Sequence, residues 1–424
     1  MISAVRSAWA LLLGIALIML GNGLQGTLLG IRATLEGFST GVTGLVMTGY
    51  FAGFLLGSTL APKIVGQVGH IRVFAALASL ASASALIYAI FVDPWVWGAM
   101  RLITGFSYAG LYVVAESWLN DRATNETRGQ ILSIYMIITL GGMAAGQFLL
   151  NVADPGGFGL FVLISVLVSV ALVPISLTAA PAPAFDAPLP VGLRQLYRIS
   201  PLGLIGIGGV GLAQGMVFGM GAVYARGAGL SIAETSLFMG LILLGGVALQ
   251  WPIGWLSDII DRRRVITAVT FAAAALAVVA AAVPDMPLPG LLVVACLFGG
   301  MNLPMYSLCN AHTNDFLEPA QVVGASSALV LVSGVGATFG PMLAAASITR
   351  LGPGGFFWML GAVHAMIGLF ALYRMVRRSA VPLEEQGVFV AIPARASPMA
   401  AALNPEAPGD AGDWENIPVG PTDE

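Results

Sequence analysis

The chain has 424 residues, of which 58% are hydrophobic and only 9% are charged. A soluble domain carries roughly 25% charged residues, so this chain has too little polar surface to cover a globule in water. The formal net charge is −3 and no polybasic stripe occurs, which excludes a nucleic-acid-binding protein. Composition therefore predicts an all-α membrane protein that is embedded in a lipid bilayer.

Twelve stretches of the chain are long and apolar enough to be membrane-spanning helices, each of which needs about 20 residues. They lie at roughly 7–30, 42–66, 72–91, 95–119, 129–152, 158–178, 201–225, 235–257, 264–283, 289–313, 321–348 and 355–376. The connector 179–200 contains PAPAFDAPLP and separates an N-terminal six-helix bundle, 1–178, from a C-terminal one, 201–376. Residues 377–424 are acidic, Pro/Ala-rich and non-periodic, so we expect a disordered cytoplasmic tail.

Basic residues are distributed unequally between the connectors. With the N-terminus inside, thirteen arginine and lysine residues lie on the inner side, and only Arg32, Arg226 and Arg350 lie outside. The positive-inside rule therefore predicts a multi-pass protein of the bacterial inner membrane with both termini in the cytoplasm. We expect the chain to act as a monomer.

The two halves of the chain repeat each other at an offset of 194 residues, which is typical of an internal transporter repeat. Tyr112 aligns with Tyr306, and Asp121 aligns with Asp315. The glycines that follow the same offset are Gly142, Gly146, Gly336 and Gly340. The repeat predicts two pseudo-symmetric six-helix bundles.

One connector carries a specific motif. After the eighth span, residues 254–264 read GWLSDIIDRRR. This sequence resembles the inter-helix signature of the major facilitator superfamily, Gly-x-Leu-x-Asp-x-x-Gly-Arg-Arg, with Asp261 in place of the second glycine. The connector after span two is degenerate, because Gly66 replaces the acidic residue. The resemblance implies a permease with the twelve-helix major facilitator fold.

Two further spans resemble the same family. Arg101 and Gly105 fit its Arg-x-x-x-Gly pattern, in which the buried arginine is linked to proton coupling. Span five has Gln147 where the antiporter motif of the family has proline, so the antiport signature is incomplete. Residues 116–120 (ESWLN) and 30–38 (GIRATLEGF) look most like the uncharacterised YcaD-like bacterial branch, which implies a permease but no substrate.

Span four carries a polar stripe from Arg101 to Glu116, because its polar and aromatic residues recur every three or four positions. The offset of 194 gives a second stripe in span ten. In the superfamily, spans one, four, seven and ten line a central cavity, so the resemblance implies that these side chains face the substrate. The predicted cavity residues are Asn22, Gln25, Tyr108, Tyr112, Gln214, Asn302, Tyr306 and Asn310.

Two charged residues lie within span four. An intramembrane charge costs about 2.5–3.5 kcal/mol, so it seldom persists without a role. Glu116 either takes up and releases a proton during transport, or it pairs with Lys63 or Arg72. Arg101 either binds an anionic substrate or tunes Glu116, or it hydrogen bonds to carbonyl groups of span one. Direct pairing of Arg101 with Glu116 is excluded, because they lie about 22 Å apart along the helix.

Charged residues at the ends of the spans form two further predicted groups. We expect Asp258 to cap a helix start and to pair with arginines. Such ion pairs can hold the inner ends of the helices together in one conformation of the protein and break in the other. Arg32 and Glu36 are either an ion pair at the outer surface or part of a periplasmic gate. The predicted cytoplasmic latch consists of Arg72, Asp121, Asp258, Arg262, Arg263 and Asp315.

These patterns favour a secondary transporter that moves a small organic solute by alternating access with proton coupling. Aromatic stripes favour export of an apolar or weakly polar compound, whereas Arg101 keeps import of an anionic metabolite open. A third possibility is a non-transporting membrane sensor or a lipid-moving relative. The chain has no HExxH, GxSxG or phosphate-loop motif, so we expect neither an enzyme nor a bound metal or cofactor.

Overall fold

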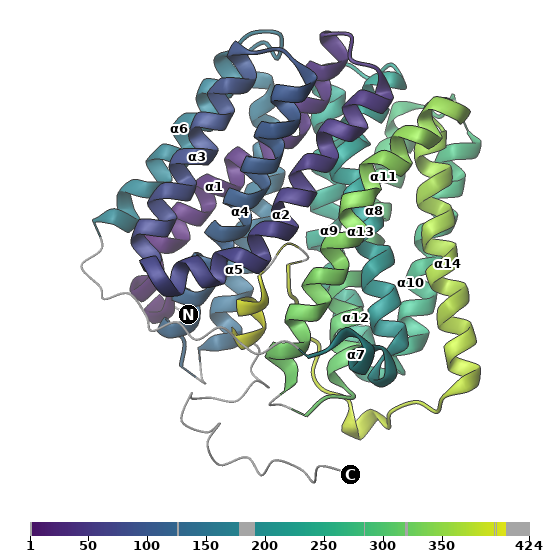
Figure 1. Cartoon of the computed structure of the whole chain (residues 1–424). Helices are drawn as coiled ribbons and strands as arrows, with labels where there is room; N and C mark the ends of the chain where they lie inside the picture. Colours follow the sequence, from purple (N-terminus) through teal and green to yellow (C-terminus); the bar gives the residue numbers. More distant parts are fainter. Residues whose placement is uncertain are drawn as a thin grey trace.

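A computed structural model describes residues 2–124, 127–177, 191–283, 285–318, 321–393, 395 and 397–403. Every regular element in these ranges is a helix, and the helices form two bundles that stand side by side (Figure 1). Most of the predicted connector, residues 178–190, lies outside the described residues, as do residues 404–424 of the predicted tail.

The first bundle contains six long helices. They are α1 (Ile2–Leu35), α2 (Thr40–Val68), α3 (His70–Ile90), α4 (Pro94–Arg122), α5 (Arg128–Phe148) and α6 (Gly159–Ser176). A 3-10 turn, η1 (Leu149–Val152), follows α5 directly. We call the face at which α1 begins and α6 ends the terminal face, and the other end of the bundle the opposite face.

The second bundle follows a short helix, α7 (Leu193–Ile199), which lies at the terminal face (Figure 1). Its helices are α8 (Pro201–Gly227), α9 (Ile232–Ile259), α10 (Arg262–Ala282), α11 (Leu288–Asn302), α12 (Met305–Asn314), α13 (Val322–Leu351) and α14 (Gly355–Arg377). One span is divided into α11 and α12 at Pro304, which lacks the backbone N–H of a continuous helix. The 3-10 turns η3 (Leu383–Glu385) and η4 (Pro398–Leu403) follow α14.

All twelve predicted spans are confirmed as helices. Eleven spans of the described chain are long and apolar enough to cross a membrane, with α11 and α12 counted together. The twelfth is α4, whose 29 residues include Arg101 and Glu116, both buried inside the protein. Large apolar side chains such as Trp251 and Leu369 are exposed on the outside, where lipid would cover them.

Several helices begin at residues that cap their free backbone N–H groups. The Asp93 carboxylate accepts hydrogen bonds from the first turn of α4, and Pro94 follows at the first helical position. Ser231 and Glu234 form a reciprocal capping box at the start of α9. Local sequence therefore fixes where these spans start.

Glycines let α2 and α4 cross closely. A Cβ atom on Gly105 would overlap the carbonyl oxygen of Tyr50, and one on Gly53 would overlap that of Leu102. Helices α9 and α11 cross in the same way, and the offset of 194 relates Gly105 to Gly299. The corresponding pairs in the second bundle are Gly299 with Ile242 and Gly245 with Cys296. The internal repeat is therefore present in the helix packing.

Replacing Gly105 by Ala is expected to destabilise the protein by about 1–3 kcal/mol, because the new methyl group overlaps the backbone of α2. Gly98, two turns earlier on α4, is the matched control, since a Cβ atom there meets nothing within 4 Å. Gly98→Ala is expected to stabilise α4 by up to about 1 kcal/mol. Thermal unfolding of both variants in detergent checks this, and equal melting temperatures would refute the close crossing.

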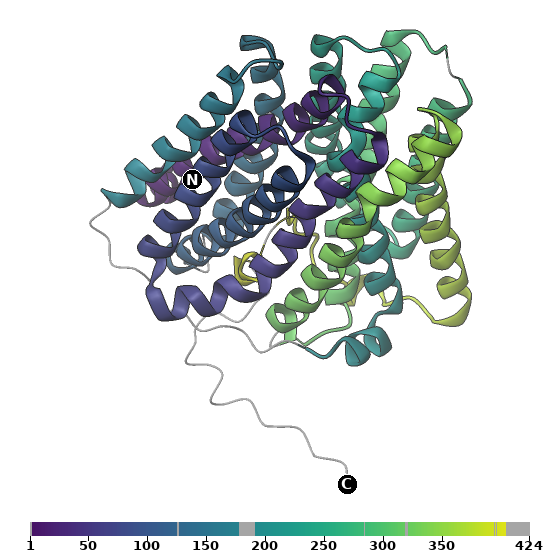
Figure 2. The ribbon, with the colours of Figure 1, turned by 45° about the horizontal axis from the view of Figure 1, so that its top comes forward.

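The two bundles meet mainly toward the opposite face. Helices α2 and α13 lie side by side in both views of the molecule, and Gly44 packs against Pro341 and Ala345 (Figure 2). The Ser236 hydroxyl on α9 donates to the Gln147 carbonyl oxygen on α5 at 2.6 Å. Toward the terminal face, the chain beyond α14 lies between the bundles, where η4 packs against α4, α5 and α13.

Candidate transport site

The polar stripe on α4 faces the interior of the protein. Arg101, Tyr108, Tyr112 and Glu116 are all buried. The guanidinium carbon of Arg101 lies 4.5 Å from the centre of the Tyr50 ring, which is a cation–π distance. Among the described residues, Arg101 donates no hydrogen bond to a carbonyl group of α1. This arrangement differs from the alternative in which Arg101 hydrogen bonds to the carbonyl groups of span one.

A hydrogen-bonded group joins α1, α2 and α4. The Asn22 amide donates to the Tyr112 hydroxyl at 3.1 Å and to the Tyr50 hydroxyl at 3.3 Å. Asn22 and Arg101 both line a central cavity, together with Gly23, Gly26, Thr27, Tyr50, Phe51, Met143, Gln147, Phe218, Met239 and Arg395. Both bundles contribute to this lining, because Phe218 and Met239 come from α8 and α9.

A second cavity lies next to the first and shares Met143, Phe218 and Arg395 with it. Gln214 lines this second cavity together with Gln250 of α9. The other predicted cavity residues line neither of these two cavities. One of them, Asn310, lines a separate small cavity at the terminal face.

Several of these side chains are buried without a hydrogen-bond partner in the described part of the chain. The atoms concerned include both polar atoms of Gln25, one amide nitrogen each of Gln214 and Asn310, and the hydroxyls of Tyr108 and Tyr306. Buried polar groups are normally satisfied by protein, water or ligand. These atoms could therefore be satisfied by water or by a polar solute.

Asn302 has a different environment from the other predicted cavity residues. Its amide oxygen lies 3.2 Å from Nε2 of His364, whose Nδ1 lies 2.9 Å from the Leu360 carbonyl oxygen. This contact joins α11 to α14 inside the second bundle. Asn302 and His364 therefore contribute to helix packing.

Glu116 is fully buried and has hydroxyl and backbone N–H partners. Its carboxylate accepts a 2.5 Å hydrogen bond from the Tyr135 hydroxyl of α5. The Ser397 backbone N–H and hydroxyl donate to its other oxygen at 2.7 and 2.5 Å. Among the described residues, neither Lys63 nor Arg72 forms an ion pair with Glu116. The structure therefore differs from the alternative in which Glu116 pairs with one of these two residues.

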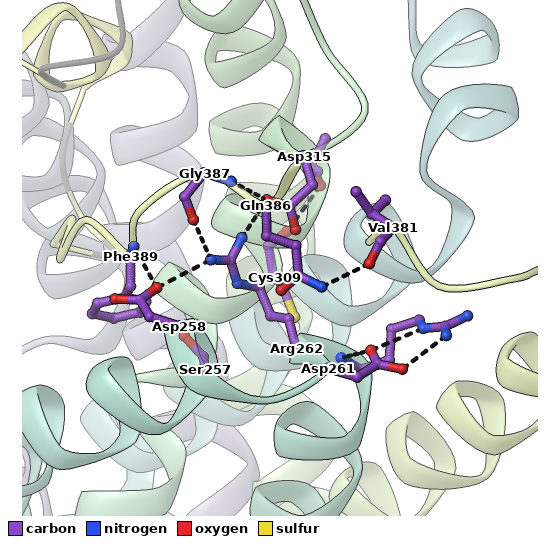
Figure 3. A network of polar contacts seen from close by, with 12 residues as sticks. Ser257, Asp258, Asp261, Arg262, Cys309, Asp315, Val381, Gln386, Gly387 and Phe389 are labelled. Atoms are coloured by element: carbon purple, nitrogen blue, oxygen red, sulfur yellow. Dashed lines mark hydrogen bonds and ion pairs between the residues drawn. The ribbon is translucent and has the colours of Figure 1, made fainter. Parts of the chain in front are cut away.

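Charged residues at the end of α9 and the start of α10 form a compact group at the terminal face. Asp258 lies in the last turn of α9, so the residue that caps α10 is Asp261 and not Asp258 as predicted. Arg262 pairs with Asp315 and, at 3.3 Å, with Asp258 (Figure 3). We call these three residues the Arg262 cluster. Arg263 pairs separately with Asp261 at 2.8 Å. Burial alone would raise the pKa of Asp261, but the hydrogen bonds and charge of Arg263 outweigh burial and lower it.

The Arg262 cluster lies entirely within the second bundle. Of the predicted latch residues in the first bundle, neither Arg72 nor Asp121 takes part in any of the ion pairs of the described chain. The cluster instead holds the chain after α14. Arg262 donates to the Gly387 carbonyl oxygen at 2.6 Å, and Asp258 accepts from the Phe389 N–H at 2.8 Å.

Arg32 and Glu36 form an ion pair at 2.6 Å, near the opposite face. Arg32 also donates to the carbonyl oxygens of Pro155 and Gly157 at 3.2 and 3.3 Å, and to that of Gly156. All of these groups belong to the first bundle. The pair therefore joins the end of α1 to the connector before α6, and does not bridge the two bundles.

Sequence reasoning missed several residues that surround the cavity and Glu116. They are Tyr50, Phe51, Tyr135, Phe218, Arg395 and Ser397. An aromatic residue in an apolar span resembles any core residue, so no pattern marked the first four. Arg395 and Ser397 lie in a Pro/Ala-rich stretch where composition predicts disorder. Only the unusual presence of an arginine in that stretch offered a signal.

A helical membrane protein with a polar cavity between two repeated bundles has the architecture of a membrane transporter. The sequence model of the Major Facilitator Superfamily matches residues 11–249 and 203–405. The chain therefore belongs to this superfamily of transporters, and it is not an enzyme.

The relatives and solved structures agree with that assignment. The chain is 24% identical over 380 residues to the "Uncharacterized MFS-type transporter YcaD" of Escherichia fergusonii, and 25% identical over 381 residues to that of Escherichia coli O7:K1. Each alignment covers 89% of this chain and 98% of the relative. These relatives support the predicted resemblance to the YcaD-like branch.

Solved structures share the fold at low sequence identity. The nucleoside transporter NupG has a TM-score of 0.70 at 13% identity, covering 87% of this chain and 98% of NupG. The D-xylose–proton symporter has a TM-score of 0.69 at 11% identity, covering 91% and 99%. A bacterial homologue of the lysosomal transporter Spinster, in an inward-facing and occupied conformation, has a TM-score of 0.69 at 14% identity, covering 90% and 98%. These similarities confirm the major facilitator fold.

Proposed function

We propose that the protein is a secondary transporter that moves a small organic solute by alternating access and couples this movement to protons through Glu116. The observation that carries the proposal is a fully buried carboxylate whose described partners are hydroxyl and N–H groups rather than a cation. An ionised carboxylate is costly to bury without a positive partner. A group in this environment can bind a proton in one state of the transport cycle and release it in another.

The moving units in this proposal are the two bundles, residues 1–178 and 201–376, joined by the connector 179–200. Close packing between the bundles toward the opposite face supports this division, because it leaves the terminal face as the side on which they can separate. Rigid-body rocking of one repeat against the other would then expose the central cavity alternately to the two sides.

The basic residues support an orientation in the bacterial inner membrane with the terminal face, and therefore both termini, in the cytoplasm. In that orientation the close contacts between α2 and α13 lie on the periplasmic side. The arrangement then corresponds to an inward-facing state. The similarity to an inward-facing Spinster homologue is in keeping with this orientation.

The transported solute is proposed to be small and organic. Aromatic rings of Tyr50, Phe51 and Phe218 line the cavity between polar groups of Asn22 and Gln147, which favours a weakly polar compound and its export. Proteins of similar fold include a nucleoside transporter and a D-xylose–proton symporter. We propose that this chain likewise transports a small organic solute.

Import of an anionic metabolite is the second candidate. Arg101 lines the cavity and its Nε–H has no hydrogen-bond partner in the described chain. A carboxylate or phosphate group would satisfy this donor by a charge-assisted hydrogen bond. If the protein binds anions and Arg101→Gln abolishes this binding, the result would favour import of an anionic metabolite over export of a weakly polar compound.

Two experiments in sequence test the proposal. A thermal-shift screen of the purified protein against metabolites and drugs identifies ligands that stabilise it by binding. Proteoliposome flux of each ligand is then measured with and without an imposed pH gradient. We expect flux that increases with the gradient. Binding without any flux would instead favour a membrane sensor, and flux of lipid alone would favour a lipid-moving protein.

A further inference from the structure

The chain after α14 does not leave the protein at the terminal face. It crosses from the second bundle to the first and contacts the groups that the transport proposal uses. We propose that residues 386–393, 395 and 397–403 form an intramolecular plug, which closes the central cavity from the terminal face and must leave before solute or protons can reach it from that side. This proposal concerns access to the cavity and does not depend on the identity of the solute.

The first anchor of the plug is the Arg262 cluster. Arg262 donates to the Gly387 carbonyl oxygen at 2.6 Å, while the Gly387 N–H donates to Asp315 at 3.2 Å. The Phe389 N–H donates to Asp258 at 2.8 Å (Figure 3). Three charged side chains are thus directed at the backbone of one short segment. Hydrogen bonds to charged groups are stronger than those between neutral groups.

The second anchor lies deeper in the second bundle. The Ser307 hydroxyl donates to the Ile392 carbonyl oxygen at 3.0 Å and accepts from the Ile392 N–H at 3.1 Å. Gln250 of α9 donates to the same hydroxyl at 3.0 Å. The side chain of Ile392 is buried. Both backbone groups of Ile392 are therefore satisfied by one side chain of α12.

The third anchor joins the two bundles. The guanidinium carbon of Arg395 lies 4.2 Å from the centre of the Phe218 ring on α8. It also lies 5.7 and 5.9 Å from the ring centres of Tyr50 and Phe51 on α2. Arg395 lines both central cavities. A side chain of the C-terminal segment therefore occupies the space where a solute would bind.

The fourth anchor is Glu116 itself. Ser397 donates two hydrogen bonds to its carboxylate, and the side chains of Met399 and Leu403 are buried in the core cluster that contains Tyr135. While these contacts hold, solvent on the terminal face cannot reach the carboxylate. The plug also packs against helices of both bundles toward the terminal face, so closing of that face requires its departure.

Cysteine labelling of the full chain tests the plug without any solute. Cys296 and Cys309 are first replaced by Ala, and Met143→Cys then supplies one reporter that lines both cavities. The protein is placed in lipid nanodiscs, so that a charged maleimide reaches both faces. The comparison is between the unaltered C-terminal segment, Arg395→Ala/Ser397→Ala, and Glu385→Gln, an exposed residue before the plug.

We expect the reporter to react at least about tenfold faster in Arg395→Ala/Ser397→Ala, since the Ser397 hydroxyl hydrogen bond to the Glu116 carboxylate and the Arg395 contact with the Phe218 ring are both lost. Glu385→Gln should react at the rate of the unaltered segment. Equal rates in all three proteins would overturn the proposal. Because labelling requires no transport, this outcome is distinct from a failure to detect solute flux.

A disulfide supplies a second test if the double variant does not fold. The ring of Phe389 lies where a Cβ atom on Gly254 would be, so Gly254→Cys/Phe389→Cys places two thiols near each other. In the same background lacking Cys296 and Cys309, mild oxidation should link residues 254 and 389, as detected by mass spectrometry of the joined peptides. Absence of the linked peptide in folded protein would contradict the plug.

Discussion

Glu116→Gln is expected to abolish solute accumulation driven by a pH gradient while leaving exchange of solute between the two sides intact. Glutamine keeps the size of the side chain and one acceptor oxygen for Tyr135 and Ser397, but it cannot bind and release a proton at neutral pH. The carrier would then still bind solute and alternate, without coupling to the gradient. Both fluxes are measured in proteoliposomes with a ligand from the thermal-shift screen.

Tyr135→Phe is the matched control for the Glu116 prediction. It removes one hydrogen bond to the carboxylate and preserves the titratable group, so gradient-driven accumulation should be weakened but not lost. Accumulation that survives Glu116→Gln at full rate would contradict proton coupling through this residue. Loss of the Glu116→Gln protein from the membrane would instead show that the carboxylate is needed for folding.

Arg262→Ala is expected to destabilise the protein by about 3–5 kcal/mol, which is the usual cost of removing one partner from a buried ion pair. Arg262 is almost fully buried, and its removal breaks the ion pair with the buried carboxylate of Asp315. Asp258 and the Gly387 carbonyl oxygen lose a donor as well. Unfolding by denaturant in detergent measures the change.

Arg264→Ala is the control for Arg262→Ala, because Arg264 is two positions along the same run and its side chain is exposed. A surface substitution of this kind changes stability by about 0.5 kcal/mol or less. Similar losses in both variants would mean that the run contributes only general positive charge. A large loss confined to Arg262→Ala would support the specific role of the cluster.

Much of the fold could be predicted from the sequence, because the thickness of the hydrocarbon region fixes the length of an apolar span. Hydropathy therefore located all twelve spans, including α4 despite Arg101 and Glu116 within it. Caps such as Asp93 mark where helices begin. The break at Pro304 was not predicted, since a proline in a long apolar run can kink a helix or end it.

The candidate site was only partly predictable. Spacing along α4 placed Arg101 and Glu116 on one stripe, because residues three or four apart share a helical face, and both side chains are buried in the structure. Their partners come from other helices, and spacing within one helix does not identify them. The repeat suggested that Asp121 would act like Asp315. However, the end of α2 has Gly66 where the end of α9 has Asp258, and the ion-pair cluster of the described residues lies in the second bundle.

The C-terminal segment was the least predictable part of the described chain. Its Pro/Ala-rich composition lacks the apolar periodicity of a span, yet Ile392, Ser397 and Leu403 are buried. Glu116 and Ser397 are 281 positions apart in the sequence. Contacts over such a separation depend on the shape of the assembled cavity, which composition does not encode.

Alternating movement of the two bundles is the central claim, and distances between spin labels test it most directly. One label pair, Gln67→Cys and Glu318→Cys, lies at the terminal face; the other, Thr34→Cys and Ala228→Cys, lies at the opposite face. On binding of a transported solute with protons, we predict that distances across the terminal face shorten while those across the opposite face lengthen. Distances that stay unchanged at both faces, or that change in the same direction, would contradict alternating access.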